Sequence, residues 1–138
     1  MSALSTRGVI LDTHVWVWWV NGSKELSKTA THRINQAMAK KSVYLSAISA
    51  WEVALLVRQG RLVLTMDVQD WTARTEVLPF VQIVPVDIPI AVKSVHLPGD
   101  FHKDPADRII VATALRFGLP VVTRDDRIWQ YSHVQSVW

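Results

Sequence analysis

The chain has 138 residues, of which 49% are hydrophobic and 20% are charged, with a net charge of +3 and no cysteine. These values are typical of a single globular domain with a sizeable core, and they exclude a disulfide framework, a thiolate metal site and a disordered chain. No apolar run reaches the roughly 20 residues that a membrane helix needs, and the opening MSALSTRG has no signal-peptide pattern, so we expect a cytoplasmic protein without a membrane partner.

Short apolar runs alternate with amphipathic stretches along the whole chain. The runs predicted to be strands are residues 8–11, 42–45, 81–86, 119–123 and 134–138. The stretches predicted to be helices are residues 13–20, 27–40, 47–59, 65–77, 88–95, 105–117 and 126–131. Residues 13–20 also have the propensity of a strand. A helix is favoured there because Trp16 and Trp19 share a helical stripe with Asp12.

Strands that alternate with helices predict right-handed βαβ units. We therefore expect an α/β fold with three layers, in which helices cover both faces of a central, mostly parallel sheet of four to five strands. Pro85 is expected to confine its strand to an edge of the sheet or to cut it short. No repeat or linker interrupts the pattern, so residues 1–138 are interpreted as one domain.

Acids are concentrated near the carboxyl end of the chain, where five of the twelve lie between Asp100 and Asp126 among several basic residues. A solvated surface of mixed charge explains this distribution without any function. A cation site for a phosphate-bearing substrate explains it as well, and the charge pattern alone leaves both alternatives open.

Asp12 and Glu52 are candidate site residues in the first half of the chain. Asp12 directly follows a predicted central strand, a position common for catalytic acids and also for helix caps. Glu52 falls within a stripe that contains Trp51 and Leu55, and buried carboxylates are rare unless they are paired or bound to a metal. A capping box starting at Ser49 is the structural alternative for Glu52.

The capping box is disfavoured because the apolar pattern of this helix already begins at residues 47–48, which makes Ser46 the better cap. Helix-start rules similarly assign Asp104 as the cap before Pro105 and place Asp107 in the first turn. Asp107 also leads a stripe of apolar residues, which predicts that it points toward the sheet. Asp125 and Asp126 follow a predicted strand and either emerge at the same edge as Asp12 or cap a short helix.

Four of these acids map to the carboxyl edge of one parallel sheet or to the helices beside it: Asp12, Glu52, Asp107 and Asp125. Converging carboxylates repel one another unless a cation neutralises them. Oxygen ligands without His or Cys partners suit Mg²⁺ or Mn²⁺ better than Zn²⁺, and such sites catalyse phosphoryl transfer. Sequence motifs of nucleotide-binding loops, zinc proteases and serine hydrolases are all missing. His102 is near the acids in sequence, but a loop histidine is more often solvated.

Four segments together resemble the PIN domain, and more narrowly the VapC-type toxins of bacterial toxin–antitoxin pairs: LDTHVWVWW, LSAISAWEVALL, HKDPADRIIVATAL and VVTRDDRI. The resemblance extends from Val9 to the end of the chain. It implies an α/β/α ribonuclease that depends on Mg²⁺ or Mn²⁺ and cleaves RNA phosphodiesters by means of a metal-activated water, leaving a 3′-hydroxyl and a 5′-phosphate.

The resemblance also implies roles for particular residues. The catalytic acids of the family fall on Asp12, Glu52, Asp107 and Asp125, and all but the glutamate are expected to hold the metal. Asp125 matches the T-x-D pattern better than Asp126. The hydroxyls of Ser46 and Thr123 are expected to support the metal shell.

The partners implied by the resemblance are RNA, a small antitoxin protein and a second copy of the chain in a homodimer. Phosphate contacts are expected from Lys103, Arg108 and Arg124, since basic side chains position RNA without reading its sequence. Four tryptophans are candidates for lining an antitoxin groove, with core and dimer packing as the alternative: Trp16, Trp19, Trp51 and Trp71. Two other functions stay open: an RNA- or partner-binding module that uses the acids structurally, and a PIN nuclease outside a toxin pair.

Overall fold

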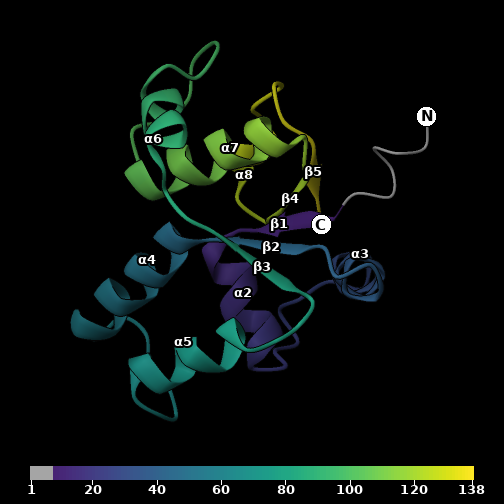
Figure 1. Ribbon diagram of the computed structural model, residues 1–138, viewed down its shortest axis with the longest axis vertical. Helices are drawn as coiled ribbons and strands as arrows, with labels where there is room; N and C mark the ends of the chain where they lie inside the picture. The colour runs from purple at the N-terminus through teal and green to yellow at the C-terminus, as the bar shows by residue number, and fades with distance from the viewer. Residues whose placement is uncertain (1–7) are drawn as a thin grey trace.

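The structure is a computed structural model that describes residues 8–138. The opening segment MSALSTRG, in which no signal peptide is expected, lies outside the described residues apart from Gly8. Within residues 8–138 the chain forms seven helices and one five-stranded sheet (Figure 1). No helix in this range combines the length and the apolar character needed to cross a bilayer.

The sheet is parallel throughout, as the alternation of strands and helices predicts. Its strands are β1 (Val9–Leu11), β2 (Val43–Ser46), β3 (Val81–Val84), β4 (Val121–Val122) and β5 (Ser136–Val137), in the order β3-β2-β1-β4-β5. The edge strand β3 ends just before Pro85, which confirms the effect expected of that proline. The central strand β1 lies between β2 and β4, so it brings the two halves of the chain together.

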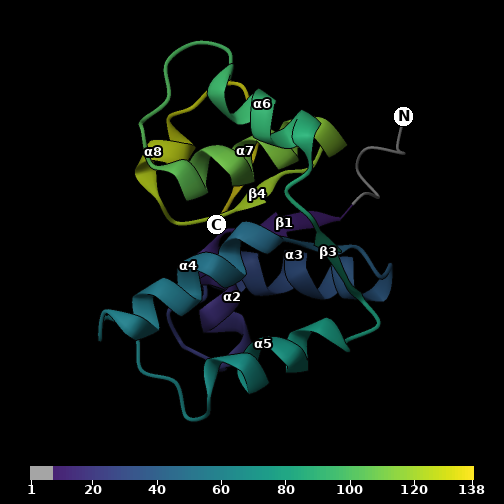
Figure 2. The ribbon, with the colours of Figure 1, turned by 60° about the vertical axis from the view of Figure 1, so that its left-hand side comes forward.

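Two layers of helices enclose the sheet and confirm the three-layer α/β/α fold (Figure 2). One face is covered by α2 (Thr13–Val20), α3 (Lys28–Ala39), α4 (Ala47–Arg58) and α5 (Val68–Glu76). The other face is covered by α6 (Ile88–Val95), α7 (Pro105–Phe117) and α8 (Asp126–Trp129). The predicted helices and strands are confirmed, with boundaries that differ by a few residues.

The core is divided by the sheet, because successive side chains of a strand point to opposite faces. Val9 and Leu11 belong to the apolar cluster beneath α2, α3, α4 and α5, whereas Ile10 belongs to the cluster beneath α6 and α7. Strand β1 is therefore buried on both sides, as its unbroken apolar sequence predicts.

The four tryptophans suggested to line an antitoxin groove do not all lie at the surface. Trp16 and Trp71 are buried in the core, with ring centroids 4.6 Å apart, and the indole nitrogen of Trp16 donates to the Thr75 hydroxyl at 3.0 Å. They cannot line a surface groove. Trp19 packs edge-on against Phe80.

Trp51 is predicted to lie on the apolar stripe of α4. This prediction is wrong, because Trp51 is 53% exposed. The buried face of α4 consists of Ser49 and Val53 instead. Small side chains let α4 approach α2, where the Thr13 hydroxyl donates to the Ser49 hydroxyl at 2.9 Å. Helix α4 is thus rotated so that Trp51 faces solvent and Glu52 is half-buried.

Candidate active site

Asp12 lies at the carboxyl end of the central strand β1 and begins α2. One carboxylate oxygen, Oδ1, accepts from the backbone N–H of Thr13 at 2.7 Å, so Asp12 is the N-cap of α2. The other oxygen, Oδ2, accepts from the Thr123 hydroxyl at 2.8 Å. Asp12 is both cap and candidate site residue, and the two roles use different oxygens.

Thr123 connects Asp12 to the end of β4. Its buried hydroxyl donates to Asp12 and accepts from the backbone N–H of Asp125 at 3.0 Å. Asp125 then caps α8 by accepting from the backbone N–H of Arg127 at 2.8 Å. The pairing of β4 with β1 therefore places Asp12, Thr123 and Asp125 at one edge of the sheet, while Asp126 is exposed.

Asp107 lies in the first turn of α7, and Asp104 caps this helix by accepting from the Asp107 N–H at 3.0 Å. The side chain of Asp107 is only 8% exposed. Its neighbours on the predicted stripe, Ile110, Val111 and Ala114, are buried as well. Both the capping role of Asp104 and the inward direction of Asp107 are confirmed.

Ser46 and Glu52 come from β2 and the helix that follows it. The Ser46 hydroxyl accepts from the Ile48 N–H at 3.2 Å, which confirms Ser46 rather than Ser49 as the cap of α4. Burial raises the pKa of Glu52, and the negative charges of Asp104 and Asp12 add to the effect. Glu52 is thus within electrostatic reach of the other acids, one turn into α4.

Burial and mutual repulsion act together on these carboxyl groups. Burial, followed by the charges of Asp12, Asp104, Asp125 and Glu52, raises the pKa of Asp107 to about 8. Burial likewise raises the pKa of Asp12, against the lowering effect of the Thr123 hydrogen bond. The structure thus brings all four predicted acids into one electrostatic unit in which they cannot ionise together without a compensating positive charge.

Arg127, which the sequence analysis does not single out, supplies part of that charge. Its Nη2 atom lies 2.9 Å from Asp125 Oδ2 and 3.4 Å from Asp107 Oδ2, and its Nε donates to Asp125 Oδ1 at 3.2 Å. These hydrogen bonds lower the pKa of Asp125. The only sequence signal was an arginine two residues beyond the T-x-D acid.

His102 also lies at the acids, contrary to the expectation of a solvated loop histidine. Its Nε2 atom is 3.1 Å from Asp107 Oδ2, and its Nδ1 accepts from the backbone N–H of Asp104 at 3.3 Å. Burial lowers the pKa of His102. Because Nδ1 accepts, a neutral His102 ring carries its proton on Nε2, the atom that faces Asp107 at the start of α7.

The basic residues expected to contact phosphate differ in their surroundings. Lys103 is exposed beside Asp104. Arg108 instead donates to the backbone carbonyls of Ser94 at 2.8 Å, Phe101 at 2.8 Å and His102 at 3.1 Å, which fastens the end of α6 and the next loop to α7. This network disfavours Arg108 as a phosphate ligand. Arg124 is half-exposed and pairs with Glu25 at 2.7 Å.

Oxygen donors dominate the site, and their raised pKa values fit a hard divalent cation, which would neutralise them. As the side chains stand, no three of the His, Asp or Glu groups within residues 8–138 are arranged to hold a metal ion. Arg127 lies between Asp107 and Asp125, two of the acids that would hold such an ion. The donor set fits Mg²⁺ or Mn²⁺, and binding would require Arg127 to withdraw.

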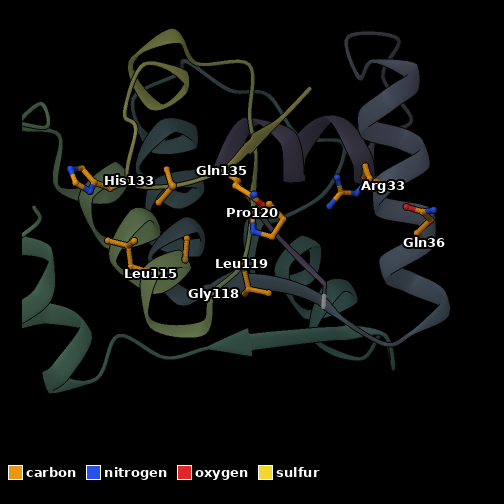
Figure 3. A pocket seen from close by; sticks show the side chains of 10 residues that line it. Arg33, Gln36, Leu115, Gly118, Leu119, Pro120, His133 and Gln135 are labelled. Atoms are coloured by element: carbon orange, nitrogen blue, oxygen red, sulfur yellow. The ribbon is translucent and has the colours of Figure 1, made fainter. Parts of the chain in front are cut away.

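A hollow of about 740 Å³ lies at the end of β4 opposite to the acids, where Gly118 and Pro120 lead into the strand. Arg33 and Gln36 of α3 line one side, and His133 lies on the other (Figure 3). This hollow contains no carboxylate and is separated from the acids by the length of the strand, so it does not belong to the candidate active site.

Comparison with known proteins places this geometry in a family. The PIN domain profile matches residues 9–134. Ribonuclease VapC22 of Mycobacterium tuberculosis (strain ATCC 25618 / H37Rv) is 36% identical over 129 residues, which cover 94% of this chain and 95% of the relative. The resemblance seen in the sequence is therefore confirmed.

Solved structures agree at the level of the fold. DNA-bound VapBC from Salmonella typhimurium is 16% identical with a TM-score of 0.66, covering 94% of this chain and 96% of that one. FitAcB from Neisseria gonorrhoeae is 26% identical with a TM-score of 0.58, covering 93% and 95%. With its parallel sheet, its acids at the carboxyl edge and these relatives, the chain belongs to the PIN domain family.

Proposed function

We propose that this protein is an endoribonuclease that depends on Mg²⁺ or Mn²⁺ and acts as the toxin of a toxin–antitoxin pair. The observation that carries the proposal is the meeting of acids from three segments: Thr123 donates to Asp12 at 2.8 Å, and Arg127 Nη2 lies 3.4 Å from Asp107 and 2.9 Å from Asp125. In agreement, burial and the charges of the surrounding acids raise the pKa of Asp107 to about 8. Acids that repel one another in this way are costly to a fold unless a ligand uses them. The name of the relative Ribonuclease VapC22 supports RNA as the substrate.

The roles of the residues follow from their positions. Asp12, Asp107 and Asp125 would hold the cation, and Glu52 would complete the acidic wall. When bound, the cation supplies the positive charge and Lewis acidity that phosphodiester hydrolysis needs. Thr123 fixes the orientation of Asp12 through its 2.8 Å hydrogen bond, and Ser46 holds the start of α4, from which Glu52 projects.

Conservative amide substitutions test this proposal. Asp12→Asn and Asp107→Asn each remove a charge without changing side-chain size, and each is expected to lower the cleavage of labelled RNA in Mn²⁺ by about 100-fold or more. Asp126→Asn is the matched control, because Asp126 is exposed and adjacent to the site. Cleavage that persists undiminished in both site variants would refute the assignment. RNA binding that resists EDTA, with no cleavage, would instead establish a binding module.

The biological role has its own test. Expression of the protein should arrest growth, and Asp12→Asn should relieve the arrest while the variant stays folded. A small reading frame immediately upstream, encoding a DNA-binding antitoxin whose co-expression restores growth, supports the toxin. If cleavage is retained but growth continues, the protein is a PIN nuclease outside a toxin pair. The proposed compartment is the cytoplasm.

Protein partners are proposed from the relatives and the surface. The solved relatives include VapBC and a toxin–antitoxin complex from Klebsiella pneumoniae, which supports an antitoxin partner. Exposed apolar side chains on α4 and α6 offer surface for an antitoxin or a second copy: Trp51, Ile88, Val92 and Val95. Size-exclusion chromatography with light scattering, on the wild type and on Val92→Glu, tests the proposed homodimer.

A further inference from the structure

A pocket of about 260 Å³ opens directly beside the acids, with Asp12 and Asp125 in its lining. Its remaining lining comes from His14, Val15 and Trp18 of α2 and from Arg124. Residues 14 and 18 lie one turn apart on one face of α2, which begins immediately after Asp12. The pocket is thus built by the same segment that positions Asp12.

Apart from the two acids, the lining combines aromatic rings with the guanidinium of Arg124. The guanidinium carbon of Arg124 lies 4.6 Å from the ring centroid of Trp18 and 5.9 Å from that of Trp138. The two indole rings are 5.7 Å apart. Glu25 holds one Nη of Arg124 at 2.7 Å, and the other N–H groups of Arg124 donate no hydrogen bond within residues 8–138. A guanidinium stacked on an aromatic ring, with N–H groups that bond to no other residue of 8–138, therefore borders the site.

His14 completes the wall from the solvent side. It is exposed, and its ring centroid is 6.1 Å from that of Trp18 with an interplanar angle of 44°. The volume of the pocket is slightly below the roughly 300–1,000 Å³ of ligand sites for whole small molecules, which suits one ring system. An aliphatic side chain in this pocket would leave the donors of Arg124 unmatched, whereas a nucleobase offers both a π-face and acceptor atoms.

We propose that the pocket formed by His14, Trp18 and Arg124 holds the unpaired base of a nucleotide next to the scissile phosphate of a single-stranded RNA. The base stacks on the Trp18–Arg124 plane, and its sugar–phosphate chain then passes over Asp12 and Asp125. This inference rests on the proposed ribonuclease function. It limits the substrate to unpaired RNA, because a base within a duplex cannot enter the pocket without leaving its stack.

Binding measured in EDTA separates this inference from cleavage. The dissociation constant of a fluorescein-labelled single-stranded oligoribonucleotide is determined by anisotropy for the wild type, Trp18→Leu and Trp18→Phe. Trp18→Leu should weaken binding about tenfold, and Trp18→Phe should restore most of the loss. Trp19→Leu is the matched control, because the neighbouring indole packs on Phe80 instead of the pocket. Arg124→Lys, at an exposed position, keeps the charge but loses the plane, so it should also weaken binding.

An abasic substitution in the RNA identifies the stacked base. Removing the base beside the cleaved position should weaken binding to the wild type by the same factor as Trp18→Leu, and it should not weaken binding to Trp18→Leu further. Equal effects of Trp18→Leu and Trp19→Leu on RNA binding would overturn the inference while leaving the nuclease assignment intact. Unchanged RNA binding in Trp18→Leu, together with loss of binding to the co-expressed upstream antitoxin, would make the pocket a protein site and overturn it too. If the wild type cleaves no RNA, the proposed function fails, whereas the comparison of Trp18→Leu with Trp19→Leu in EDTA still decides the pocket.

Discussion

Arg127 donates two hydrogen bonds to Asp125, from Nη2 to Oδ2 at 2.9 Å and from Nε to Oδ1 at 3.2 Å. The same Nη2 reaches Asp107 Oδ2 at 3.4 Å. The guanidinium therefore partly neutralises two of the acids. In the proposed metal site, the cation and the arginine would compete for the same carboxylate oxygens.

Replacing Arg127 by Met should consequently strengthen the binding of Mn²⁺, because the ion no longer has to displace an internal cation. The ion pair is half-exposed and therefore worth only about 0.2–1 kcal/mol, so the expected gain is at most about fivefold. Isothermal titration calorimetry at fixed pH measures it, with Arg58→Met, on the exposed end of α4, as the control. Weaker binding by Arg127→Met would show that the arginine supports the cation site instead.

The raised pKa of Asp107 makes stability depend on pH. The folded state keeps this proton up to about pH 8, whereas the unfolded state releases it near 3.8. The stabilising contribution of the protonated form is complete below the lower value and is lost as the pH rises through the upper one. Urea unfolding without divalent cations should show the wild type losing stability across this window, by about 1.4 kcal/mol for each pKa unit of the shift.

Asp107→Asn cannot ionise, so it should lack this slope and be more stable than the wild type at pH 9 in EDTA. Adding Mn²⁺ should stabilise the wild type but not the variant, since the ion binds the ionised carboxylate. Asp126→Asn should follow the wild type. A wild type whose stability is flat between pH 4 and 8 would contradict the raised pKa.

We expect the Thr123 hydroxyl to be required for full activity, because it orients the Asp12 carboxylate. Thr123→Val keeps the shape of the side chain but leaves Asp12 Oδ2 and the Asp125 N–H without their partner. The expected loss of stability in urea unfolding is about 1–3 kcal/mol, accompanied by slower RNA cleavage. Thr113→Val is the matched control, because that buried hydroxyl donates only to Ile109 O within α7. Equal cleavage rates in the two variants would exclude an orienting role for Thr123.

Arg108 should behave as a structural residue. Arg108→Met removes the hydrogen bonds to the carbonyls of Ser94, Phe101 and His102, and it should cost about 1.5–3 kcal/mol in urea unfolding. The salt dependence of RNA affinity should be unchanged relative to Arg116→Met, an exposed control on the same helix. A slope of log K against log salt that falls by about 0.7 would instead identify a phosphate contact.

The order of elements and the caps could be predicted because they depend on local chemistry. Ser27, Ser46 and Asp104 each accept from a backbone N–H in the first turn of the following helix, and these residue types are common in that role for this reason. The meeting of the acids was also predictable, since the topology of parallel strands determines which strand ends share an edge.

The orientation of individual side chains was less predictable. The sequence places Trp51 on an apolar stripe, but α4 turns Ser49 and Val53 inward because small side chains permit a close approach to α2. Arg127, in α8, and His102, in the loop before α7, meet Asp107 only in the folded structure. Neither contact has a local pattern, so no reading of the linear sequence could have assigned them.

The hydrogen bond between Thr123 and Asp12 joins residues 111 positions apart in the chain. Until β4 pairs with β1, the strand that carries Asp12 has a neighbour on one side only, and the hydroxyl that orients its carboxylate has not arrived. A chain still emerging from the ribosome, or one cut before Thr123, therefore contains Asp12, Glu52 and Asp107 without a complete site. For an enzyme whose proposed target is the RNA of the cell that makes it, the proposed site is complete only after β4 has been synthesised and has paired with β1.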